Sequence, residues 1–218
     1  NFHVLNLSFF KINDFAIKII KWLKYGVPIS IWSTVGLSMS FFDRFFIDKF
    51  YDAQALGAYS SISELSMRIF SFIIFPFTMA LHPRINRLWN NQKQKEAVKI
   101  IELSIRIIMS LLILILILFF LFENFVYDIV KLIIPTIPYE VLIILFPLIL
   151  SGIFWQLSFF SHKIIELKEK TYLMVLFIII SMIINLIGNL YFLPRYGIIA
   201  TACTSSISSF FYFFITYL

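Results

Sequence analysis

The sequence predicts an all-α integral membrane protein, folded as a bundle of six transmembrane helices. Two observations support this fold class. Hydrophobic residues make up 61% of the chain and charged residues only 14%, whereas a soluble domain carries about 25% charged residues. Apolar stretches of about 20 residues, the length of a helix that crosses the hydrocarbon core of a bilayer, recur along the whole chain.

Six stretches are long and apolar enough to be assigned as spans, although the second has charged residues near its middle. The expected spans are residues 25–42, 55–81, 100–122, 141–161, 171–193 and 196–218. The last three are free of charged residues throughout. The second contains both Glu64 and Arg68, and the uncharged part of the third begins after Arg106.

The distribution of basic residues predicts how the bundle is oriented. Twelve of the 18 lysines and arginines lie before the first span and in the second and fourth connections, namely Lys11, Lys18, Lys21, Lys24, Arg84, Arg87, Lys93, Lys95, Lys99, Lys163, Lys168 and Lys170. The opposite connections hold four, namely Arg44, Lys49, Lys131 and Arg195. Short cytoplasmic loops are enriched in Lys and Arg. We therefore expect both ends of the chain to be cytoplasmic.

Residues 1–24 are predicted to form a cytoplasmic amphipathic linker that precedes the six-helix bundle of residues 25–218. Lys11, Asp14, Lys18 and Lys21 recur at helical spacing, with apolar residues on the other faces. Such a basic stripe suits a helix that lies on an anionic membrane surface. A plain linker that leads into the first span fits the same pattern. The chain opens on Asn1 and carries no signal-peptide pattern, so we expect a fragment whose upstream part is missing.

Glu64 and Arg68 are the leading candidates for function. An ionisable group at bilayer depth costs roughly 2.5–3.5 kcal/mol even on insertion scales, so it usually faces a bundle interior or a polar pathway. At positions i and i+4 the two side chains share a helix face and can pair. One interpretation is a cavity position whose guanidinium binds a phosphate bidentately. The other is a buried ion pair that only fixes helix packing.

Two further sets of polar residues are candidates for substrate binding. Asp43 and Arg44 begin a charged cluster at the outer end of the first span, which also fits a solvated loop that ends the helix. Asn185 and Asn189 repeat along one face of the fifth span. That face fits either hydrogen-bonded helix packing or the lining of a cavity.

The sequence offers no support for an enzyme. It contains no GxSxG, HExxH or Walker-type glycine motif. Cys203 is the single cysteine, which excludes an internal disulfide, and the three histidines are scattered. We expect no cofactor, no metal site and no nucleic-acid partner.

Several motifs occur in an order that resembles the Wzx-type polysaccharide (O-antigen) flippases of the multidrug/oligosaccharidyl-lipid/polysaccharide exporter superfamily. The first span opens with Lys24-Tyr25-Gly26-Val27-Pro28 and closes with Phe42-Asp43-Arg44-Phe45-Phe46-Ile47. Leu56-Gly57-Ala58-Tyr59-Ser60 follows, and the second span ends in His82-Pro83-Arg84. Later come Lys170-Thr171, Asn185, Leu193-Pro194-Arg195-Tyr196-Gly197 and Thr201. The resemblance covers nearly the whole chain, aligned to the second half of a transporter with about twelve spans.

This resemblance implies a MATE-like fold, of which the chain would form one of two six-helix bundles around a central cavity. It implies a protein of the bacterial cytoplasmic (inner) membrane that moves oligosaccharides linked to polyprenyl pyrophosphate across the bilayer, for lipopolysaccharide or capsule synthesis. Its partners would be that lipid-linked substrate, membrane lipids and the missing N-terminal half of the same transporter. Arg68 would stabilise the anionic head group, and Glu64 would compensate the cation in the empty cavity.

Three rival functions remain open. A cation-coupled multidrug exporter of the same superfamily would need acidic residues deep in the membrane, and by sequence only Glu64 qualifies. A membrane scaffold without transport activity is compatible with a single ion pair. A membrane-embedded transferase would need a deep histidine or a catalytic acidic loop, and neither is apparent in the sequence.

Overall fold

Long helices follow the apolar stretches of the sequence closely. The structure, a computed structural model, describes residues 12–135 and 137–218, and these residues contain no strand. The elements are α1 (Ile12–Phe50), α2 (Ala53–Asn90), α3 (Gln94–Leu121), α4 (Glu123–Ile133), the 3₁₀ helix η2 (Tyr139–Ile144), α5 (Leu145–Ser161), α6 (Lys163–Leu167), α7 (Thr171–Tyr196) and α8 (Ile198–Tyr217). The all-α fold class is confirmed.

Five helical stretches within the described residues are long and apolar enough to cross a membrane: α2, α3, residues 141–167, α7 and α8. They correspond to the last five predicted spans. The boundary between the last two spans differs slightly from the prediction, because α7 continues to Tyr196. The break falls at Gly197, whose φ of 74° lies in the left-handed region that favours glycine.

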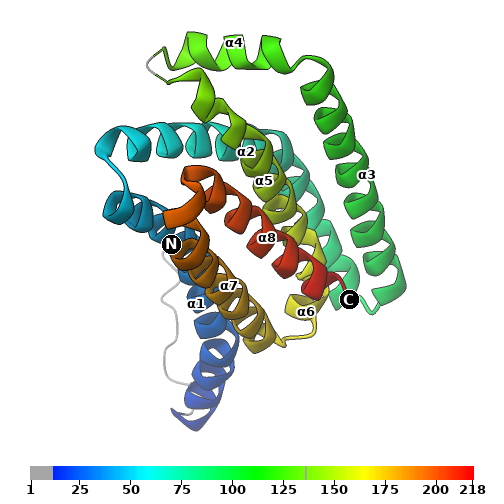
Figure 1. Cartoon of the computed structure of the whole chain (residues 1–218). Helices are drawn as coiled ribbons and strands as arrows, with labels where there is room; N and C mark the ends of the chain where they lie inside the picture. Colours follow the sequence, from blue (N-terminus) through cyan, green and yellow to red (C-terminus); the bar gives the residue numbers. More distant parts are fainter. Residues whose placement is uncertain (1–11, 136) are drawn as a thin grey trace, which may run out of the picture.

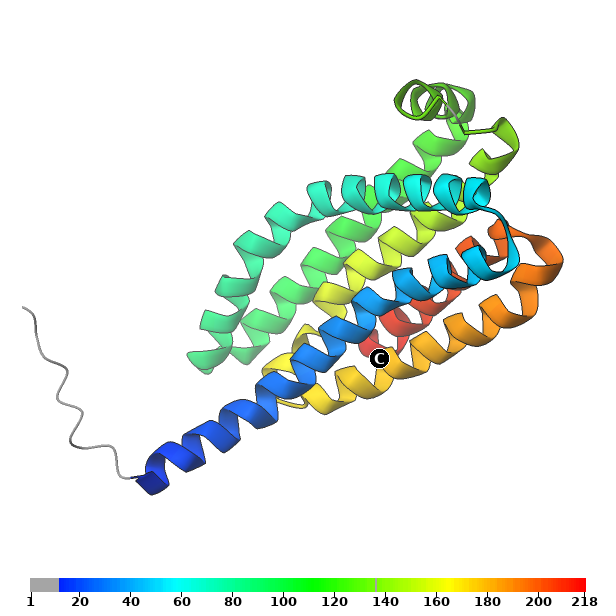
Figure 2. The ribbon, with the colours of Figure 1, turned by 90° about the vertical axis from the view of Figure 1, so that its left-hand side faces the viewer.

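The first predicted span, residues 25–42, is part of α1. This helix has 39 residues and is long enough to cross a membrane, but it is not among the five candidate spans. It lies alongside α7 (Figure 2). That α1 crosses the membrane as a sixth span stays a prediction.

The predicted linker and the first span are joined in one helix. From Ile12 onward, α1 runs past Pro28 to Phe50 without a break. Two hydrogen bonds fasten it to the end of the bundle that contains α6: the Tyr25 hydroxyl donates to Glu166 Oε1 at 3.2 Å, and the Thr171 hydroxyl donates to the Tyr25 carbonyl at 3.4 Å. The division at residue 24 and the membrane-surface role of the basic stripe stay predictions, and Lys11 lies outside the described residues.

α2 begins at a side-chain cap and bends along its length. The Asp52 carboxylate accepts a hydrogen bond from the Ala55 amide at 2.8 Å, which satisfies one of the free N–H groups of the first turn. Pro76 lies inside the helix and cannot donate to the preceding turn. Figure 2 shows the first part of the helix running away from α1 after their shared loop, with a bend further along. The two helices therefore diverge from the end where Tyr51 and Asp52 connect them.

A short helix, α4, lies where a loop was predicted. It follows α3 directly and lies across the ends of α3 and α5 (Figure 1). Phe125, Ile129, Leu132 and Ile133 are exposed on one side of it, at the spacing of an amphipathic helix. Apolar side chains exposed in this pattern are typical of a helix at a membrane interface.

α5 and α8 form the centre of the bundle. α8 packs against both α5 and α7, while α2 and α3 cover the other side of α5. Small residues allow the close approach of α7 and α8, because a Cβ atom added to Gly188 would overlap the Thr204 side chain. Predominantly apolar side chains fill the remaining space between the helices, and Ile62, Ile74 and Leu157 are completely buried.

We expect Gly188→Ala to destabilise the bundle by about 1–3 kcal/mol, the usual cost of overpacking a well-packed core. The matched control is Gly57→Ala, because a Cβ atom there has no neighbour within 4 Å and alanine favours a helix. Melting temperatures of the detergent-solubilised proteins would measure both effects. An unchanged melting temperature for Gly188→Ala would contradict the close packing of α7 on α8.

Candidate functional site

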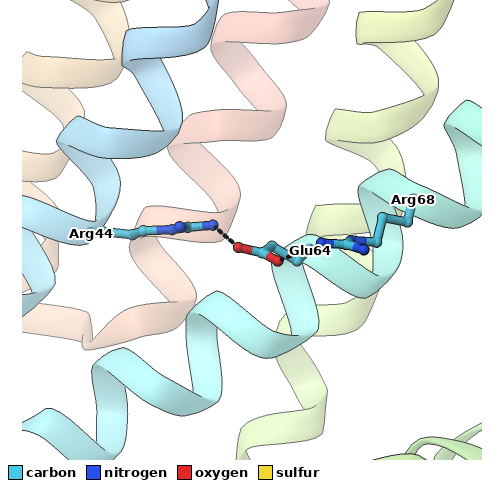
Figure 3. A network of polar contacts seen from close by, with 3 residues as sticks. All are labelled: Arg44, Glu64 and Arg68. Atoms are coloured by element: carbon cyan, nitrogen blue, oxygen red, sulfur yellow. Dashed lines mark hydrogen bonds and ion pairs between the residues drawn. The ribbon is translucent and has the colours of Figure 1, made fainter.

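Three charged side chains form a chain of ion pairs between α1 and α2 (Figure 3). Arg44 Nη2 lies 2.9 Å from Glu64 Oε1, and Arg68 Nη2 lies 3.3 Å from Glu64 Oε2. The predicted pairing of Glu64 with Arg68 is confirmed. The participation of Arg44 was not expected, because it comes from another helix 20 residues earlier.

This network lies on the surface of the bundle. The side chains of Arg44, Glu64 and Arg68 are 31%, 47% and 81% exposed, respectively. Among the described residues the pair is therefore not buried, and its role in packing or in substrate binding stays a prediction. One carboxylate faces two guanidinium groups, so the network carries a net positive charge. Hydrogen bonds from both arginines stabilise the Glu64 carboxylate. The Arg68 guanidinium has five N–H donors, and its side chain is mostly exposed, so it can donate to further acceptors outside the bundle.

Asp43, the neighbour of Arg44 in sequence, points into the bundle. Successive residues on a helix differ by about 100° in direction, so the two side chains lie on different sides of α1. Asp43 is only 5% exposed. Its carboxylate accepts hydrogen bonds from Asn189 Nδ2 at 2.8 Å, from the Tyr59 hydroxyl at 3.1 Å and from the Ser205 hydroxyl.

The prediction that Asp43 belongs to a solvated loop is wrong, because α1 continues to Phe50 and buries this side chain. Besides Glu64 on the surface, Asp43 is thus an acidic residue inside the bundle, and the depth of both in the membrane stays a prediction. Asp43 contacts residues of α2, α7 and α8, so it joins four helices through hydrogen bonds. A buried carboxylate needs such donors to offset its lost hydration.

Asn185 and Asn189 belong to the same buried network. Asn189 Nδ2 also donates to Asn185 Oδ1 at 3.1 Å, and Asn185 Nδ2 donates to the Ser205 hydroxyl at 3.1 Å. Both side chains are at most 1% exposed. The six predicted site residues thus form two separate groups: Arg44, Glu64 and Arg68 on the surface, and Asp43, Asn185 and Asn189 inside.

Comparison with known families identifies the family of this chain. Residues 28–191, about three quarters of the chain, match the MatE family. The chain belongs to the MatE family. The match covers all six predicted site residues and ends within α7. No curated protein and no solved structure matches the chain.

MatE family membership indicates a membrane transporter of the multidrug/oligosaccharidyl-lipid/polysaccharide exporter superfamily, a family of transporters and not of enzymes. This agrees with the apolar helices, which indicate an integral membrane protein. Within residues 12–135 and 137–218, no three His, Cys, Asp or Glu side chains are grouped so that they could hold a metal ion.

A cavity of about 250 Å³ in this MatE chain, with a lining of mixed polar and apolar side chains, lies beside Asp43. Asp43, Tyr59 and Ser205 line it together with serines of α1, α2, α5 and α8, namely Ser40, Ser63, Ser71, Ser151 and Ser209. Sequence reasoning missed this cavity, because its serines are spread over four helices and come together only in the folded bundle. Hydroxyl and carboxylate groups of this kind can hold water or a small polar ligand.

Proposed function

We propose that this chain takes part in moving oligosaccharides linked to polyprenyl pyrophosphate across the bacterial cytoplasmic membrane, for the synthesis of surface polysaccharide. The observation that supports this function is the surplus cation on α2. Glu64 is already paired with Arg44, and the Arg68 guanidinium beside it is 81% exposed. A planar guanidinium matches two oxygens of a phosphate group.

On this proposal, Arg68 and Arg44 bind the anionic head group of the substrate from α2 and α1. Glu64 keeps both arginines oriented and partly neutral when no substrate is bound. The chain would provide one wall of the transport path, and a second six-helix half would face it. Arg68 would then lie on the surface between the two halves, which gives a reason for its exposure.

The direct test is transport of a fluorescent lipid-linked oligosaccharide by the complete protein in liposomes. A dithionite-type quencher that cannot cross the bilayer reports how much substrate reaches the outer leaflet. The proposal requires faster exchange of this substrate than of a fluorescent phospholipid. Equal rates in protein-free liposomes and proteoliposomes would refute it.

A second candidate function is cation-coupled export of small molecules within the same superfamily. Asp43 favours it, because it is a buried carboxylate beside a cavity that is partly lined by hydroxyl groups. Gain or loss of a proton or cation at such a group changes the charge of the bundle interior. Export of a cationic dye that depends on a proton or sodium gradient, with no transport of lipid-linked oligosaccharide, would support this function over the first.

A further inference from the structure

An apolar groove, separate from the cavity beside Asp43, runs between α2, α3, α4 and α5. Its volume is about 460 Å³, within the range of about 300–1,000 Å³ found for sites that hold organic ligands. Twelve of its thirteen lining residues are apolar, and Ser66 is the exception. Four are phenylalanines, namely Phe70, Phe119, Phe122 and Phe125.

The groove is open to the surroundings of the bundle. Ile69, Leu118, Phe122 and Phe125 line it and are 45–63% exposed. α4 closes it at one end, since Phe125, Val126 and Val130 of that helix belong to its lining, and Figure 1 shows this helix lying across the ends of α3 and α5. A hydrocarbon chain could therefore enter from the lipid side and end beneath α4.

Arg68 lies at the edge of this groove. Leu65 and Ile69 belong to the lining, and they are three residues before and one residue after Arg68 on α2. Residues three apart are neighbours on a helix surface. An exposed cation thus borders a long apolar surface within a membrane-spanning helix, an arrangement complementary to a lipid with an anionic head group.

We infer that the groove binds the polyprenyl tail of the substrate while Arg68 binds its phosphate, an inference that rests on the proposed function. Arg68 is part of a spanning helix, so a head group bound to it lies at the depth of the membrane. The lipid tail of the substrate must then leave the transport path at that depth. The groove offers an apolar surface at that level. Each part of the substrate is then surrounded by groups of its own polarity, which favours binding of the whole molecule.

The test measures binding of a long-chain polyprenyl phosphate to the complete, delipidated protein by native mass spectrometry. Ile115→Trp places a larger side chain in the groove, and Leu114→Trp is its control because Leu114 is half exposed on α3 and outside the lining. We expect Ile115→Trp to weaken binding about tenfold or more, since it displaces several buried CH₂ groups. Leu114→Trp should bind like the parent.

Two further comparisons separate the tail from the head group. Arg68→Gln should weaken binding of the polyprenyl phosphate but not of the uncharged polyprenol. Phosphatidylglycerol should bind equally well to the parent and to Ile115→Trp. If Ile115→Trp does not fold, Ser66→Leu fills the groove from α2 and should give the same result.

Unchanged polyprenyl phosphate binding in a folded groove-filling variant would overturn the inference. A groove that is covered by a protein segment would give this result. Equal weakening for phosphatidylglycerol would overturn it too, because the groove would then hold bulk lipid. Failure of the proposed function looks different. The groove-dependent binding would persist, but the parent protein would not move lipid-linked oligosaccharide in liposomes.

Discussion

A protein in which Arg44, Glu64 and Arg68 are all replaced by leucine should insert at the level of the parent, yet export little surface polysaccharide. Removing three ionisable groups from two helices lowers the cost of placing those helices in a bilayer. Export should fall by about 10- to 100-fold, because hydrogen bonds to charged groups contribute about 1.5–3 kcal/mol. Polysaccharide at the cell surface and protein in the membrane fraction would be measured together.

Single changes at Arg68 should give a graded result. Arg68→Lys keeps the charge but loses the planar fork, so it should export partially, whereas Arg68→Gln should export much less. The matched control is Arg106→Gln on α3, because Arg106 is 77% exposed and pairs with Glu102 by the same i,i+4 spacing at 3.5 Å. Normal export by the well-inserted triple variant would show that the three charges do not bind substrate.

The second large effect is expected at Asp43. Asp43→Ala leaves hydrogen-bond donors of Asn189, Tyr59 and Ser205 without their acceptor inside the bundle. Each unsatisfied buried group costs about 1–3 kcal/mol, so the variant should lose several kcal/mol of stability. We expect a low yield and a melting temperature well below that of the parent after solubilisation.

Asp43→Asn and Asp48→Ala give this prediction its controls. Asp43→Asn keeps one oxygen acceptor and the shape of the side chain, so it should retain more stability than Asp43→Ala. Asp48 is on the same helix but exposed, and Asp48→Ala should change the melting temperature little. A stable Asp43→Ala protein would mean that water replaces the carboxylate and that the network does not hold the four helices together.

The fold was largely predictable, because hydropathy and helix length determine which segments can cross a bilayer. The last five spans needed only shifts at their ends. α4 was missed since it has 11 residues, too few to span, and it contains Glu123, Asp128 and Lys131, which made it resemble a loop. The continuation of α1 to Phe50 was missed for a related reason: a run of charges looked like the end of a helix.

The candidate site was predictable only in part. The spacing of Glu64 and Arg68 on one helix was sufficient to predict their pairing. No local pattern relates Arg44 to Glu64, because their contact depends on how α1 crosses α2. The same holds for Asp43, which meets Asn189 across 146 residues of sequence. The polar face of α7 was recognised, but its partner on α1 could be found only from the arrangement of the helices in space.

The unbroken course of α1 has a mechanical consequence. A helix of 39 residues is a rod about 58 Å long, and side-chain hydrogen bonds hold it at two places: near Tyr25, to Glu166 and Thr171, and at Asp43, to α2, α7 and α8. Arg44 lies about 28 Å further along that rod. Once the hydrogen bonds of Asp43 are broken, a tilt of about 10° around Tyr25 would carry the arginine about 5 Å, enough to separate it from Glu64. The Asp43 network therefore determines whether a tilt near Tyr25 can change the charge presented near Arg44.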